Sequence, residues 1–127
     1  MIVVDSSGWL EFFTDGPLAE DYAVRLRNPS MIVTPTIILY EVYKRLKRDL
    51  SEEDAVTAAG ALQRTRLVPL NEDLALTAAD ISLAHGLAMA DAIVLATARM
   101  CRAELVTSDA DFEGIDGVTY LAKRSRR

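Results

Sequence analysis

Short apolar segments that alternate with long helical patterns constrain the fold of this chain more than any other feature. Segments of three or four residues, which are candidates for buried strands, lie at 2–4, 31–33, 67–70, 105–107 and 118–121. Most of the chain between them carries the spacing and the start and stop signals of helices. The alternation predicts an α/β fold with three layers, α/β/α, around a short-stranded, mainly parallel central sheet.

Start and stop residues set the expected helices. Ser6 or Ser7 is expected to cap the first helix, Thr34-Pro35 to precede the third, and Gly86 to end the fifth. The expected helices cover residues 8–13, 18–27, 36–49, the stretch that begins at Ser51, 71–85 and 89–102. The last of these is apolar on almost every side, so we expect it to be central and buried.

Composition limits the class of protein. The chain has 127 residues, of which 50% are hydrophobic and 26% charged, so we expect one folded domain over 1–122 and a basic tail over 123–127. Neither a membrane span nor a signal peptide is expected. A single cysteine, Cys101, cannot form an internal disulfide, which predicts a reducing, cytoplasmic setting. One histidine and one cysteine also exclude a zinc site built on these residues.

Net charge counts against general binding to nucleic acid, because the chain carries a formal charge of −5. Positive charge is nevertheless concentrated in two places. One is the tail, and the other is a stretch that contains Lys44, Arg45, Lys47 and Arg48. Local binding of a phosphate backbone therefore remains open.

Two acidic residues each follow a predicted strand. Asp5 comes directly after 2–4, and Asp109 comes two residues after 105–107. Working sites of open parallel sheets lie beyond the carboxyl ends of the strands, so both carboxylates should lie at the same edge. Asp91 stands near the start of the apolar helix, where it either binds backbone N–H groups or enters the same crevice.

Glu41 has two readings. It lies on the face of its helix opposite the main apolar stripe, where an ion pair with Arg45 is the simpler interpretation. Ile37 and Ile38 lie one turn earlier, on or near the face of Glu41. Under the second reading the helix is buried in its first half, and Glu41 marks the border with solvent.

The four acids and their neighbours resemble the PIN-domain family. The matching stretches are Val4-Asp5-Ser6-Ser7, Glu41 in the helix after Thr34-Pro35, Asp91-Ala92, and TSDADF at 107–112. They occur in the family's order and cover nearly the whole chain. Length and the start at the first strand are most similar to the toxin members of VapBC-type toxin–antitoxin pairs.

The resemblance implies a site made of carboxylates. The implied catalytic residues are Asp5, Glu41, Asp91 and Asp109. The implied ligands of Mg²⁺ or Mn²⁺ are Asp5, Asp91 and Asp109. The implied supporting residues are Ser7, Thr107 and Asp111, and the candidates for RNA contact are Lys44, Arg45 and Arg48. Hard divalent cations prefer such oxygen ligands.

The resemblance also implies an activity and partners. It implies an endoribonuclease that hydrolyses RNA phosphodiesters with metal-activated water. A cognate antitoxin would hold the enzyme inactive, and an acidic surface suits a basic segment of such a partner. A homodimer or a toxin–antitoxin hetero-oligomer is expected.

Two other classes remain as alternatives. In an aspartyl-phosphate phosphotransfer protein Asp5 would be the nucleophile, but Ser7 stands where a haloacid dehalogenase-like pattern has a second Asp. A PIN-like fold could also serve as a catalytically silent binding module. Four acids at matching positions argue against that reading.

Overall fold

All strand pairings in the computed structural model, which describes residues 1–123, are parallel. The strands are β1 (Ile2–Val4), β2 (Val33–Pro35), β3 (Arg66–Val68), β4 (Glu104–Thr107) and β5 (Val118–Tyr120). β1, β4 and β5 form one sheet, and β2 and β3 form another. A parallel bridge between Ile2 and Ile32 joins the two, giving the order β3-β2-β1-β4-β5. The predicted α/β fold with a mainly parallel central sheet is confirmed.

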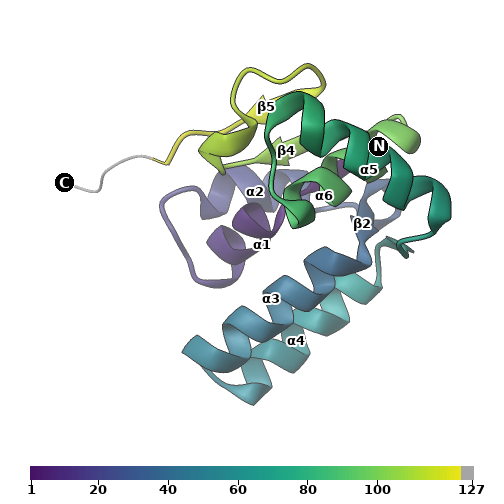
Figure 1. Cartoon of the computed structure of the whole chain (residues 1–127). Helices are drawn as coiled ribbons and strands as arrows, with labels where there is room; N and C mark the ends of the chain where they lie inside the picture. The colour runs from purple at the N-terminus through teal and green to yellow at the C-terminus, as the bar shows by residue number, and fades with distance from the viewer. Residues whose placement is uncertain (124–127) are drawn as a thin grey trace.

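Six α-helices surround the strands in the described residues. They are α1 (Ser6–Phe13), α2 (Ala19–Arg25), α3 (Thr36–Asp49), α4 (Glu52–Gln63), α5 (Glu72–His85) and α6 (Met89–Met100). Crossovers between parallel strands are right-handed as a rule, so this strand order puts the helices between β1 and β3 on one face of the sheet and α5 and α6 on the other. α3 and α4 pack side by side as a pair that extends away from the strands (Figure 1).

Two short 3-10 turns complete the described chain, at Pro29–Met31 and Ala110–Phe112. The first of them explains a wrong prediction. The strand expected at 31–33 begins at Val33, because Pro29 starts the turn that takes up Met31. Thr34 and Pro35 therefore belong to β2 and do not form a separate cap before α3.

Helix starts were predicted with mixed success. Ser51 and Asn71 accept hydrogen bonds from backbone N–H groups of α4 and α5, and Gly86 ends α5 in the left-handed conformation. The predicted cap at Ser6 or Ser7 is wrong, because both residues lie inside α1 and Asp5 occupies the N-cap position. Of the predicted tail, Lys123 is exposed, and Arg124, Arg126 and Arg127 lie outside the described residues.

The core forms where α6 meets the strands. Ala92 through Ala98 are buried without interruption, as expected for a central helix, and α6 contacts β1, β2 and β4. Cys101 follows α6 and is a half-buried free thiol. Within the described residues no single helix is long and apolar enough to cross a membrane; α5 and α6 would meet the criterion only together, and they are bent by 114°.

We predict that Gly8→Ala destabilises the fold. A methyl group at Gly8 in α1 would overlap the fully buried ring of Tyr22 in α2. Overpacking of this kind costs about 1–3 kcal/mol in the free energy of unfolding, which chemical denaturation measures.

Gly60→Ala in α4 is the matched control. Its added carbon meets no atom within 4 Å, so the change should raise stability by about 0.5–1 kcal/mol. Equal stability of Gly8→Ala and the wild type would contradict the packing described here.

Candidate active site

The pairing of β1 with β4 brings the first and last predicted acids to one edge of the sheet. Val4 pairs with Val106, so Asp5 and Asp109 both lie just beyond the carboxyl ends of neighbouring parallel strands. Asp91 is the third residue of α6, and Glu41 is the sixth residue of α3. We call Asp5, Glu41, Asp91, Asp109 and Asp111 the acidic centre.

Hydroxyl groups fix the Asp5 carboxylate. Its Oδ2 accepts hydrogen bonds from Thr107 Oγ1 at 2.8 Å and from Ser7 Oγ at 3.3 Å. The same two hydroxyl oxygens accept hydrogen bonds from backbone N–H groups just after β4. Ser108 N–H donates to Ser7 Oγ, and Asp109 N–H donates to Thr107 Oγ1, both at 3.0 Å. Asp5 is only 3% exposed, and side chains of α1 and β4 fix its orientation.

Three carboxylates could hold one ion. Single oxygen atoms of Asp91, Asp109 and Asp111 all lie within 4.8 Å of one another. Asp111 N–H also donates to Asp109 Oδ1 at 2.9 Å, which orients the Asp109 side chain. This set contains Asp111, which the sequence analysis gave a supporting role, and it does not contain Asp5.

The predicted quartet lies close enough together for the charges of some members to raise the pKa of others. Burial, and then the charges of Asp109, Asp5, Asp111 and Glu41, raise the pKa of Asp91 to about 7. Burial also raises the pKa of Glu41, with Asp5 and Asp109 adding to it and a hydrogen bond from Ser6 opposing it.

The pKa of Asp5 moves in the same direction. Burial is the main cause, the charge of Asp109 adds to it, and hydrogen bonds from Thr107, the Ser6 backbone and Ser7 oppose it. The largest charges that act on Asp91 are all carboxylates. An arrangement of this kind favours a bound divalent cation, whose charge offsets the repulsion.

The ion pair suggested for Glu41 is not formed among the described residues. Arg45 instead binds Asp49, one turn further along α3, with Nε 2.8 Å from Oδ2. Glu41 is half-buried and hydrogen-bonded with Ser6. The buried stripe of α3 runs along the helix through Ile38, Val42 and Leu46, and the half-buried Glu41 borders it.

A cavity of about 300 Å³ opens beside the acidic centre. Asp5 and Asp109 line one part of it, while Arg45 and Asp49 of α3 line another. Lys44, a further candidate for RNA contact, binds Tyr40, with Nζ 3.2 Å from the hydroxyl oxygen. Among the three candidates only Arg45 lines this cavity.

Sequence reasoning missed the residues that support the site from α1 and α2. Tyr22 Oη lies 2.6 Å from Ser108 Oγ, and burial raises the pKa of Tyr22 to about 12. Glu11, which is 9% exposed, accepts a hydrogen bond from Leu18 N–H at 3.1 Å and lines the cavity. No local pattern marks these residues, because their partners are distant in the sequence or lie across a turn.

The fold and the site define a known class. The chain belongs to the PIN domain family, whose model matches residues 2–118. No curated protein matches the chain. Among solved structures it is similar to a chain of the toxin–antitoxin complex from Klebsiella pneumoniae, with 27% identity and a TM-score of 0.79 over 94% of this chain and 96% of that one.

Two further structures share the fold. One is VapC20 from Mycobacterium tuberculosis, titled a Sarcin-Ricin loop cleaving toxin, with 24% identity and a TM-score of 0.74 over 91% of this chain and 95% of that one. The other is a chain of DNA-bound VapBC from Salmonella typhimurium, with 16% identity and a TM-score of 0.73 over 96% and 98% of the two chains.

Burial of Asp91, together with the charges of its neighbours, predicts a pH-dependent stability without metal. A carboxyl whose pKa rises from 3.8 in the unfolded chain to about 7 in the fold binds more protons when folded. The stability it contributes is present below about pH 4 and is lost as the pH rises through about 7. Thermal unfolding in a chelator should therefore occur at lower temperature at about pH 8 than at about pH 5.

Asp91→Asn should weaken that dependence and raise the unfolding temperature at about pH 8, because the neutral amide is not repelled. Asp80→Asn, the same change at an exposed position of α5, is the control. An Asp91→Asn variant with the wild-type pH dependence would show that Asp91 is not under charge repulsion.

Proposed function

We propose that the protein is a metal-dependent endoribonuclease and the toxin of a VapBC-type toxin–antitoxin pair. The single observation that supports this best is the gathering of repelling carboxylates at the strand ends of a PIN domain. Two of the similar structures add to it, because one is titled as part of a toxin–antitoxin complex and another as a cleaving toxin.

The proposed cofactor is Mg²⁺ or Mn²⁺. Asp5, Asp91 and Asp109 are the proposed ligands, and the closeness of Asp111 to the last two makes it a fourth candidate. When bound, such an ion lowers the pKa of water and stabilises charge on a phosphodiester. The donor set fits this group, since it consists of carboxylate oxygens and lacks sulfur and imidazole.

Each residue has a proposed task in hydrolysis. Thr107 and Ser7 keep the Asp5 carboxylate in one orientation. Asp111 does the same for Asp109 through its backbone N–H. Glu41 has a raised pKa and faces the same centre, so it can hold a water molecule or a proton there.

The proposed substrate is RNA. Lys44, Arg45 and Arg48 line up on the exposed side of α3, the helix that also supplies Glu41. Cations next to the acidic centre can hold the phosphate backbone while the carboxylates act on one bond. Local positive charge thus answers the objection raised by the net charge of −5.

The proposed partner is an antitoxin whose basic segment lies across the acidic centre, and an apolar part of it could occupy a second cavity. This cavity of about 340 Å³ is lined by apolar residues of α1 and α2, by Arg27, and by Arg64 after α4. Trp9 lines it too and is 3% exposed, and its Nε1 is a buried donor without an acceptor in the described residues. Because that atom is closed to solvent, the exposed Phe12 at the rim is the aromatic side chain that a partner could contact.

A second copy of the chain is a further proposed partner. Leu76 and Leu83, seven residues apart on one face of α5, are 70% and 86% exposed. Large exposed apolar side chains at such spacing are typical of a helix that packs against another protein.

The cytoplasmic location of the protein is also part of the proposal.

The aspartyl-phosphate alternative is less well supported. Asp5, its proposed nucleophile, is 3% exposed and accepts hydrogen bonds from two hydroxyls. An in-line attack on a phosphoryl donor needs an accessible carboxylate oxygen. The acidic centre also offers several neighbouring acids, which suits an ion better than a single covalent step.

Asp5→Asn is predicted to abolish RNA cleavage while the fold persists. The amide oxygen can accept the same hydrogen bonds from Thr107 and Ser7, but the charge is lost. Cleavage of labelled RNA with Mn²⁺ should fall by at least about 100-fold, and a chelator should stop the wild type. Asp80→Asn is the control, and metal-dependent cleavage retained by Asp5→Asn would refute the proposed role.

Phe12→Ala is predicted to weaken partner binding without loss of activity. The change removes an exposed ring at the rim of the second cavity and leaves the buried Trp9 in place. Binding of the antitoxin encoded by the adjacent gene should weaken about 10-fold, as isothermal titration would measure. Val24→Ala, at an exposed apolar position of α2 that does not line the cavity, is the control. Unchanged affinity of Phe12→Ala would contradict partner binding in this cavity.

A further inference from the structure

Asp49, the last residue of α3, lies between two guanidinium groups. Its Oδ2 lies 2.8 Å from Arg45 Nε, and its Oδ1 lies 2.7 Å from Arg48 Nε. Arg48 Nη2 adds a third bond, 3.2 Å long, to Oδ2. Hydrogen bonds from Arg48 and Arg45 lower the pKa of Asp49 to about 2, so the carboxylate stays charged at neutral pH.

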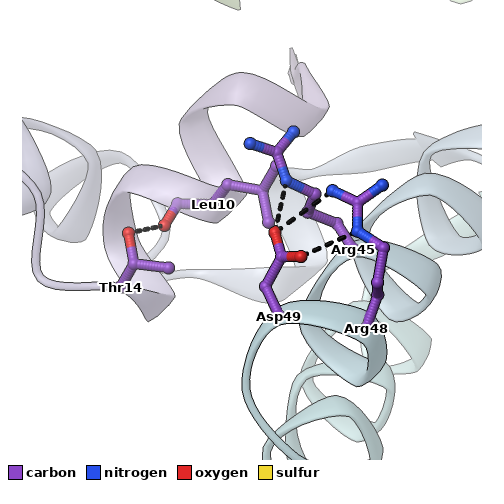
Figure 2. A network of polar contacts seen from close by, with 5 residues as sticks. All are labelled: Leu10, Thr14, Arg45, Arg48 and Asp49. Atoms are coloured by element: carbon purple, nitrogen blue, oxygen red, sulfur yellow. Dashed lines mark hydrogen bonds and ion pairs between the residues drawn. The ribbon is translucent and has the colours of Figure 1, made fainter.

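The two arginines differ in which of their N–H donors bind Asp49. Arg48 uses both Nε and Nη2 on Asp49, whereas the bond of Arg45 uses Nε alone. In Figure 2 the two terminal nitrogens of Arg45 lie on the side away from the Asp49 carboxylate. A guanidinium held through Nε presents its terminal pair of N–H donors, the geometry that matches two oxygens of a phosphate.

The position of this pair connects it with the acidic centre. Arg45 and Asp49 line the cavity that Asp5 and Asp109 also line, and Arg48 does not. Leu10 of α1 and Thr14, which follows α1, line it as well and are drawn beside the pair in Figure 2. A nucleic-acid strand with one phosphate at the carboxylates could therefore place a neighbouring phosphate at Arg45.

We propose that Asp49 is a positioning residue: it holds Arg45 through Nε, so that the terminal nitrogens of Arg45 bind a phosphate adjacent to the cleaved one. Arg48 fixes Asp49 from the other side through Nε and Nη2. This inference rests on the proposed ribonuclease activity, and it assigns different tasks to three neighbouring charged residues of α3.

Asp49 could instead be a negative charge that repels RNA, and the two views predict opposite effects of its removal on RNA binding. If Asp49 only adds negative charge near the bound RNA, its removal should strengthen RNA binding. If it orients Arg45, its removal should weaken RNA binding although the protein becomes less acidic. The sign of one measurement therefore separates the two views.

The experiment measures cleavage of a labelled single-stranded RNA with Mn²⁺ over a range of salt concentrations. It compares the wild type with Asp49→Asn, Arg45→Met and the double variant. We expect Asp49→Asn to raise KM about fivefold with little change in kcat. Arg45→Met should raise KM at least as much, and its log–log salt dependence should become shallower by about 0.7, the value for one phosphate contact on a single strand.

The double variant tests whether Asp49 acts through Arg45. Adding Asp49→Asn to Arg45→Met should have no further effect on KM, because the group that Asp49 orients is already absent. Asp80→Asn removes the same charge from an exposed site on α5 and should leave KM unchanged or slightly lower. Thermal unfolding confirms that each variant is folded.

Three results would overturn the inference. Asp49→Asn with an unchanged or lower KM overturns it and leaves the proposed function intact. Additive effects in the double variant do the same, because they show that Asp49 acts independently of Arg45. A folded wild-type protein that cleaves no RNA overturns the proposed function itself.

Discussion

Repulsion between carboxylates is the constraint on which the rest of this structure depends. Asp5, Glu41, Asp91 and Asp109 come from four separate segments of the chain; burial raises the pKa of the first three, and the charge of Asp109 adds to each of these shifts. A fold that keeps such groups together needs rigid support. β1 and β4 provide it through parallel pairing, and the fully buried Thr107 adds a short hydrogen bond to Asp5. The central position of α6 then holds Asp91 against the same edge.

The helix α3 joins two environments that the site needs. Its first half is buried against the core through Ile38 and Val42, and there it carries Glu41. The exposed side of its last turns carries the basic residues that bind Asp49, while Leu46 on the other side is buried. One rigid helix thus fixes the distance between the acidic centre and a row of cations, which suits a substrate that is itself a regularly charged chain.

Much of the fold could be predicted from the sequence because its signals are local. The bounds of α3 follow from Thr36 and the basic end of the helix, and those of α5 follow from Asn71 and Gly86. The start of α1 could not be predicted, because a serine such as Ser7 can either cap a helix or lie inside it and bind other side chains. Inside the helix its hydroxyl bonds both Asp5 and Ser108, partners brought near only by the pairing of β1 with β4.

The sequence by itself determined which acids exist, their order, and the parallel arrangement that places Asp5 and Asp109 beyond neighbouring strands. Periodicity and cap residues carry that information, because both act over a few residues. Only the tertiary structure decided that Asp111 lies near Asp91, that Arg45 binds Asp49 and not Glu41, and that Tyr22 supports Ser108. Those choices depend on burial and on distances between segments remote in the chain, which no local pattern encodes.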